Sequence, residues 1–133
     1  MTIAIDTNVL VRLFVNDTPR QTAQARNEIE QADEVILGLP ALCELVWVLR
    51  AHYRVDREGI AHFIEGLLDQ PPFSMDQACV LTGLSLLRAG ADFADGVIAE
   101  HGRQLGADVF VSFDRRAVTR LEKLGLNARA PTD

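Results

Sequence analysis

The chain opens with the stretch Thr2-Ile3-Ala4-Ile5-Asp6-Thr7-Asn8, in which four β-compatible residues lead to a carboxylate and then to a helix start. A strand that runs directly into a helix is typical of a βα unit, and in open parallel sheets ligands bind just beyond the carboxyl ends of such strands. Asp6 would lie at that edge. By itself the stretch fits an N-cap better, because Asp, Thr and Asn side chains commonly accept hydrogen bonds from the N–H groups at a helix start.

Length and composition predict one globular domain over residues 1–133, because a chain of this length that is 48% hydrophobic can bury a sizeable core. The N-terminus has no basic region and Asp6 interrupts its apolar run, so we expect no signal peptide. No window approaches the roughly 18 apolar residues of a membrane span. We expect a soluble, cytoplasmic protein without a membrane partner, in which Cys43 and Cys79 are reduced core thiols.

The formal net charge of −6 argues against a broad basic surface that binds nucleic acid through its phosphates. Any contact with nucleic acid must therefore be local. Lys123 is the single lysine, so nearly all positive charge is carried by arginine, whose planar guanidinium suits phosphate recognition.

Segments that suit strands alternate with segments that suit helices. The expected strands are 2–5, 35–38, 73–75, 109–113 and 126–129. The expected helices are 9–15, 19–32, 41–52, 57–68, 76–90, 92–105 and 115–124. In the helix 76–90, the apolar spacing predicts four side chains that point inward, Val80, Leu81, Leu84 and Leu87. The alternation implies βαβ crossovers and an α/β fold, with a mainly parallel sheet covered by helices on both faces.

Glu44 is unusual because its helix, 41–52, is apolar on nearly every side and should be largely buried. A buried carboxylate without a partner costs several kcal/mol or becomes neutral, so a charged Glu44 requires a cation or a wet cleft. An ion pair with Arg12 or Arg50 explains it equally well. The local sequence leaves both possibilities open.

Three further carboxylates stand at the starts of expected helices. Asp92 and Asp95 lie three residues apart in one first turn, where a cap and an N3 carboxylate would also stabilise the helix. Asp114 follows a strand, as Asp6 does, and the two would emerge at one sheet edge if their strands are parallel and adjacent. Carboxylates gathered in this way repel one another unless a hard cation such as Mg²⁺ or Mn²⁺ lies among them.

Other catalytic centres find no support in the sequence. Three histidines lack the spacing of a zinc site: His52, His62 and His101. No serine nucleophile elbow, glycine-rich phosphate loop or G-x-x-x-x-G-K-[ST] pattern occurs.

Taken together and in their order, four motifs resemble those of a PIN domain: Ile5-Asp6-Thr7-Asn8, Glu44 on an apolar helix, Asp92-Phe93-Ala94-Asp95 and Ser112-Phe113-Asp114. More narrowly, the chain resembles a VapC-type toxin over nearly all of its 133 residues. The resemblance implies a single PIN-like three-layer α/β/α domain with a mainly parallel central sheet. It also implies a metal-dependent endoribonuclease that is the toxin of a type II toxin–antitoxin pair.

By this resemblance, the catalytic residues and metal ligands are Asp6, Glu44 and Asp95, with Asp114 as the fourth acidic position. Four supporting residues would orient the carboxylates or a metal-bound water, or cap a helix: Thr7, Asn8, Asp92 and Ser112.

The implied cofactor is Mg²⁺, with Mn²⁺ as a possible substitute, which would lower the pKa of a bound water and stabilise charge on the attacked phosphate. Cleavage would leave a 5′-phosphate and a 3′-hydroxyl. Three arginines are candidates to hold the RNA backbone, although solvated helix positions are their ordinary interpretation: Arg12, Arg115 and Arg116. The family also implies a cognate antitoxin, which inserts an arginine into the acidic cleft, and a homodimer.

Two alternatives share the acidic pocket: a non-catalytic module that binds RNA or a protein partner, and a structure-specific DNase with the same metal chemistry. A receiver-like domain phosphorylated on aspartate is disfavoured, because such domains resemble one another in a lysine that follows a late strand. Here the only lysine, Lys123, lies deep in the last expected helix.

Overall fold

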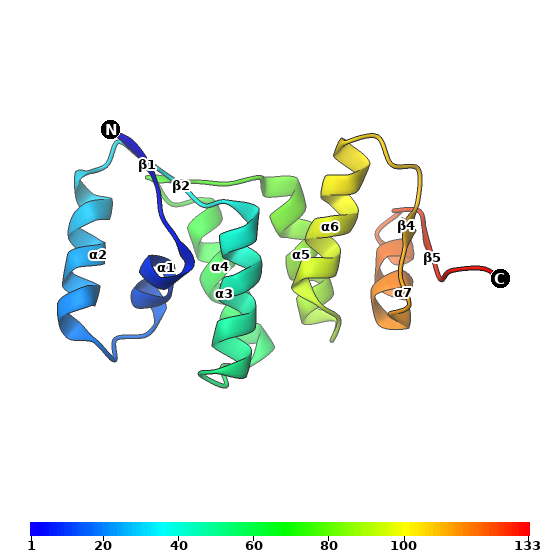
Figure 1. Ribbon diagram of the computed structural model, residues 1–133, viewed down its shortest axis with the longest axis horizontal. Helices are drawn as coiled ribbons and strands as arrows, with labels where there is room; N and C mark the ends of the chain where they lie inside the picture. Colours follow the sequence, from blue (N-terminus) through cyan, green and yellow to red (C-terminus); the bar gives the residue numbers. More distant parts are fainter. The chain divides into compact units, whose positions relative to one another are not determined.

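The computed structural model describes all 133 residues and divides them into two compact units, Met1–Asp76 and Gln77–Asp133 (Figure 1). The expectation of one domain over residues 1–133 stays a prediction. No helix combines the length and the apolar composition needed to cross a membrane. Cys79 is buried, as predicted for a core thiol, and Cys43 is half-buried.

The first unit begins with a βα unit, as its opening sequence predicts. Its elements are β1 (Thr2–Ala4), α1 (Thr7–Phe14), α2 (Pro19–Gln31), β2 (Glu34–Ile36), α3 (Leu39–Ala51), α4 (Arg57–Leu68) and β3 (Phe73–Ser74). The strands form one parallel sheet in the order β1-β2-β3, with Ile3 beside Val35 and Val35 beside Phe73. Helices connect each parallel pair, so the unit contains the predicted βαβ crossovers.

Apolar side chains of β2 and three helices build the core of the first unit. The fully buried ones include Leu10 of α1, Val35 of β2, Leu42, Leu45 and Leu49 of α3, and Ile60 and Ile64 of α4. On α3 and α4 they recur at intervals of three and four residues, which gathers them on one face of each helix. Phe63 of α4 is only half-buried and packs edge-on against Phe14, with 5.0 Å between the ring centroids.

The second unit contains α5 (Gln77–Arg88), α6 (Phe93–Gln104), β4 (Phe110–Val111), α7 (Arg115–Lys123) and β5 (Ala128–Arg129). β4 and β5 form a parallel two-stranded sheet in which Phe110 lies beside Ala128. One core cluster joins α7 and β5 to α5 and α6: Leu86, Ala91, Ala99, Ala117, Leu121 and Ala128.

The helices α5 and α6 cross very closely, and glycine makes this possible. A Cβ atom added at Gly96 would lie 2.7 Å from the Cα of Gly83 and 2.7 Å from the carbonyl oxygen of Thr82. Phe93 is fully buried beside the same crossing, where a Cβ at Gly83 would lie 2.7 Å from its ring. The crossing thus sets the position of the first turn of α6.

Two sequence predictions about the second unit are wrong. The expected strand 109–113 is only Phe110–Val111, and Phe113 is 88% exposed. The chain turns there because the Ser112 hydroxyl accepts a hydrogen bond from the backbone N–H of Asp114, which begins the next helix. Leu81 was expected to point inward but is 53% exposed, because α5 buries the stripe that contains Val80, Leu84 and Leu87 instead.

Candidate functional site

Asp6 caps the first helix of the first unit. Its Oδ1 accepts a hydrogen bond of 3.0 Å from the backbone N–H of Val9, and no hydrogen bond reaches Oδ2. The cap fixes the orientation of the carboxylate while leaving one oxygen available to a ligand. The next two residues differ: Thr7 is buried and Asn8 is exposed.

A hollow of about 300 Å³ lies beside Asp6, between α1 and α2. Its polar lining consists of Asp6, Asn8, Arg12, Gln21, Gln24 and Glu28. The hollow is wide enough for water around the unbonded Asp6 oxygen.

Glu44 lies on the exposed face of α3, so the expectation that its helix is buried on nearly every side is wrong. The helix buries four other positions, which include Leu42 and Leu45, and exposes Glu44 together with Trp47, which is 68% exposed. Glu44 forms no ion pair with Arg12 or Arg50. Its charge is therefore hydrated, and its place in a metal site stays a prediction.

The second unit brings three carboxylates together. Asp92 caps α6 by accepting a 3.0 Å hydrogen bond from the N–H of Ala94, and Asp95 follows at the third helical position. Asp114 caps α7 through N–H groups of Arg116 and Ala117, at 3.0 and 3.2 Å. The predicted caps at both helix starts are thus confirmed. Ser112, named as a supporting residue, holds the backbone of Asp114 at 3.0 Å.

Asp95 is the electrostatically strained member of this group. Its side chain is half-buried, and the loss of hydration, followed by repulsion from Asp92 and Asp114, raises the pKa of its carboxyl group. No arginine or lysine forms an ion pair with any of the three. A cation at this cluster would relieve the repulsion, and carboxylate oxygens are the ligands that Mg²⁺ and Mn²⁺ prefer.

These carboxylates fit a hard divalent cation by their chemistry but do not form a complete ligand set. No three acidic, histidine or cysteine side chains converge in the way that a metal ion requires. Asp6 and Glu44 belong to the first unit, and Asp95 and Asp114 to the second. In each unit, carboxylate oxygens of these residues lack protein partners, as Oδ2 of Asp6 and Oδ2 of Asp114 do.

Arg12 is held inside a local network that was not predicted from the sequence. Its guanidinium bonds to Asp17, to the Thr18 hydroxyl at 3.1 Å and to the Tyr53 hydroxyl at 3.3 Å, and Tyr53 also donates to Asp17 at 3.1 Å. The hydrogen bond with Tyr53 and the charge of Asp17 raise the pKa of Arg12. The ordinary interpretation as a solvated arginine is wrong for Arg12. Its role in RNA binding stays a prediction. The guanidinium is already hydrogen-bonded to Asp17, Thr18 and Tyr53.

Arg115 and Arg116 are exposed at the start of α7. They line a hollow of about 310 Å³ whose other lining residues are Ala89, Thr119, Arg120 and Lys123. Arg120 and Lys123 were not among the residues that the sequence predicted to hold RNA. Their distance of four and seven residues from Arg116 would have placed them on the same helical stripe.

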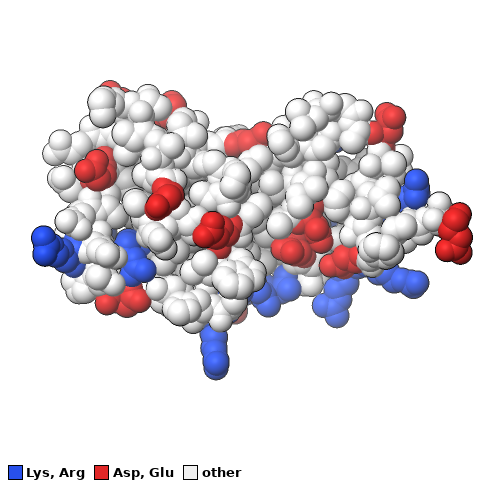
Figure 2. Space-filling model, in the orientation of Figure 1, with Lys and Arg blue, Asp and Glu red and all other residues white.

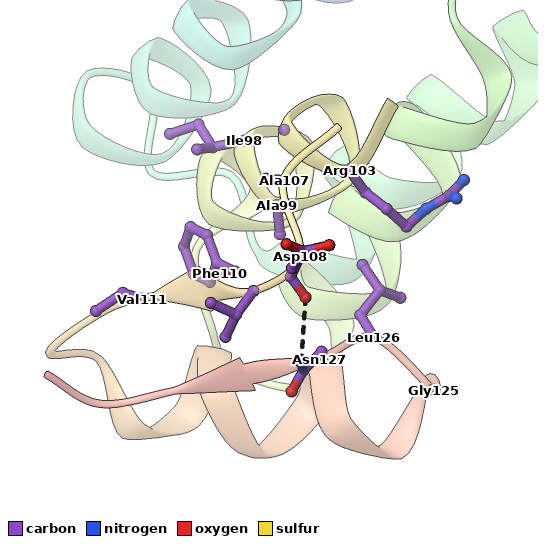
Figure 3. Close-up of a pocket in the computed structure, with 12 residues that line it drawn as sticks. Ile98, Ala99, Arg103, Ala107, Asp108, Phe110, Val111, Gly125, Leu126 and Asn127 are labelled. Carbon is purple, nitrogen blue, oxygen red and sulfur yellow. Dashed lines mark hydrogen bonds between the residues drawn. The ribbon is translucent and has the colours of Figure 1, made fainter. Parts of the chain in front are cut away.

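A larger hollow of about 440 Å³, between α6 and the two-stranded sheet, has a different character (Figure 3). Its wall is mainly apolar, with Ile98, Phe110 and Leu126. The side-chain amide of Asn127 donates a hydrogen bond to the carbonyl oxygen of Asp108 at 3.1 Å. The charged side chains that line it are Arg103, which is paired with Glu100, and Asp108.

Comparison with known proteins identifies the family of the chain. The model of the PIN domain family matches residues 3–124, a span that includes Asp6, Glu44, Asp95, Asp114 and all of α7. No curated protein matches the chain.

Proposed function

Because the chain belongs to the PIN domain family, whose members are generally metal-dependent nucleases, we propose that it is an endoribonuclease that hydrolyses RNA phosphodiester bonds. The observation that carries this proposal is Asp95. Its carboxyl group is half-buried, has a raised pKa, and lies beside two further carboxylates without a cationic partner. These properties are expected of a metal ligand before the metal binds.

The proposed metal ligands and catalytic residues are Asp6, Glu44, Asp95 and Asp114. The oxygen-only donor set favours Mg²⁺, with Mn²⁺ as a substitute. When bound, such an ion lowers the pKa of a water molecule and offsets charge on the phosphate.

The chain's own contribution is to hold these carboxylates in place. Asp6 and Asp114 each have one oxygen fixed by helix N–H groups, so the direction of the other is set before a ligand arrives. Ser112 fixes the backbone of Asp114. We propose that Thr7, Asn8 and Asp92 support the neighbouring carboxylates in the same way.

Cleavage of a labelled RNA by the purified full-length chain, with Mg²⁺ or Mn²⁺, tests the enzyme. We expect Asp95→Asn to reduce the cleavage rate at least about 100-fold, because a metal contributes several kcal/mol of transition-state stabilisation. The matched control is Asp108→Asn, which makes the same change at an exposed position of the same unit and should cleave normally. Cleavage of DNA but not RNA would replace the ribonuclease with a DNase. RNA binding without cleavage by wild type would support a binding module instead.

We further propose that this protein acts in the cytoplasm as the toxin of a toxin–antitoxin pair, as a homodimer neutralised by a cognate antitoxin. The unpaired acidic cluster suits a basic segment of such a partner. Expression should arrest growth, Asp95→Asn should not, and a small protein encoded beside the gene should restore growth. Unimpaired growth on expression of an enzyme that cleaves RNA in vitro would remove the toxin role and leave the nuclease.

A further inference from the structure

The outer face of α7 carries the densest group of positive charges in the second unit. Arg116, Arg120 and Lys123 stand at i, i+4 and i+7, so they form one stripe along the helix, and Arg115 flanks its start. All four line the hollow of about 310 Å³ described above, and no acidic residue lines it. In the second unit, Figure 2 shows acidic atoms over the lower part of α6 and basic atoms along the edge below them.

The packing of α7 sets the direction of this stripe. Ala117 and Leu121, on the opposite side of the helix, are fully buried, which fixes its rotation. Two of the arginines are also anchored. The Nε of Arg120 donates to the Ser85 hydroxyl at 3.0 Å, and an Nη of Arg116 donates to the carbonyl oxygen of Gly90 at 3.4 Å.

These anchors engage one nitrogen of each guanidinium, and the other N–H groups form no hydrogen bond to the protein. An arginine that is already oriented loses less conformational freedom when it binds a phosphate, and its remaining N–H groups can bind two phosphate oxygens at once. Lys123 adds a point charge at the far end of the stripe.

The dimensions fit a nucleic-acid strand. From Arg115 to Lys123 the helix rises about 12 Å at 1.5 Å per residue, a length along which a stacked strand carries about three phosphates. The stripe begins directly after Asp114, whose carboxylate caps the same helix within the acidic cluster. In a chain with a net charge of −6, this is the kind of local phosphate contact that the composition requires.

We propose that the hollow lined by Arg115, Arg116, Arg120 and Lys123 binds the sugar–phosphate backbone of the RNA substrate next to the cleaved phosphodiester. Arg120 and Lys123 are backbone-binding residues in this proposal, and they read no sequence. The identity of the strand as the one that is cut rests on the proposed nuclease function.

Binding can be measured apart from cleavage. We would follow the fluorescence anisotropy of a labelled 20-nucleotide single-stranded RNA, without divalent metal, over a range of salt concentrations. The full-length Asp95→Asn chain serves as the background, so that no cleavage interferes. The test variant is Arg120→Gln/Lys123→Gln, and the matched control is Arg20→Gln/Arg26→Gln, which removes two exposed charges from α2.

Each lost phosphate contact should lower the slope of log K against log[salt] by about 0.7, which corresponds to about 5-fold in affinity at 0.1 M salt. The test variant should therefore lose about 25-fold, and the control much less. A chain with Arg120→Lys instead should keep most of the salt slope of its background, because lysine keeps the positive charge. A test variant with the slope and affinity of its background, or equal losses in test and control, would overturn the proposal.

Two further outcomes separate this proposal from the proposed function. If wild type cleaves no RNA but the salt slope still depends on Arg120 and Lys123, the proposed nuclease function is refuted and RNA binding in the α7 hollow is supported. If wild type cleaves RNA and the Arg120→Gln/Lys123→Gln change affects neither binding nor cleavage, RNA binding in the α7 hollow is refuted and the proposed nuclease function is supported. An equal loss of affinity for a poly-glutamate peptide would also count against an RNA groove, because the site would then bind any polyanion.

Discussion

Replacement of Gly96 by alanine tests the close crossing of α5 and α6, which positions Asp95 one residue earlier. The added Cβ would lie 2.7 Å from two backbone atoms of α5, so no side-chain rotation can relieve the contact. To go from 2.7 Å to an ordinary contact of 3.4 Å, the helices must separate by about 0.7 Å.

Such overpacking typically costs about 1–3 kcal/mol, and alanine returns about 1 kcal/mol through its better helix propensity. We expect the free energy of unfolding of Gly96→Ala to fall by about 0–2 kcal/mol. Gly66 on α4 is the matched control, because nothing lies within 4 Å of an added Cβ there. Gly66→Ala should gain about 0.5–1 kcal/mol.

Urea unfolding followed by far-ultraviolet circular dichroism measures both variants against wild type. The difference between the two variants is the test, since the two substitutions are chemically identical. A gain in Gly96→Ala equal to that in Gly66→Ala would refute the close backbone contact between α5 and α6.

The remaining predictions concern Asp95 and Tyr53. Because burial and the neighbouring carboxylates raise the pKa of Asp95, the folded chain holds this proton to a higher pH than the unfolded chain does, so stability falls as pH rises through that range. In metal-free buffer at neutral pH, Asp95→Asn should thus melt at a higher temperature than wild type, and the difference should disappear below the ordinary pKa of 3.8. Added Mn²⁺ should raise the melting temperature of wild type more than that of the variant, and equal shifts would argue against Asp95 as a ligand. Tyr53→Phe removes the hydroxyl that joins Arg12 and Asp17, and urea unfolding should show a loss of about 1 kcal/mol, whereas unchanged stability would show that the network contributes nothing.

Helix starts could be predicted from the sequence because a cap joins a side chain to backbone N–H groups only two or three residues away. Asp6, Asp56 and Asp92 all form such caps, with Val9, Gly59 and Ala94 as donors. Thr18 directly precedes α2, but its side chain forms no cap bond. Its hydroxyl accepts from Arg12 instead, a contact that depends on how the chain packs after α1.

The candidate site could be predicted in part. The spacing of Asp92 and Asp95 within one helical turn, and the place of Asp114 after a strand, identified the three carboxylates that the second unit brings together. Glu44 was selected because of its apolar neighbours, yet it lies on the exposed side of its helix. Its metal-binding role, with that of Asp6, stays a proposal.

By itself, the sequence determined the α/β class, the order of the elements, the capping aspartates and the family, because these follow from short-range bonds, the period of apolar residues and local motifs. Only the tertiary structure decided that Leu81 and Phe113 are exposed, that Arg120 is anchored on Ser85, and that Asp95 loses hydration beside Asp114. Those properties arise from packing between segments far apart in the chain, where burial and charge depend on neighbours that no local pattern specifies.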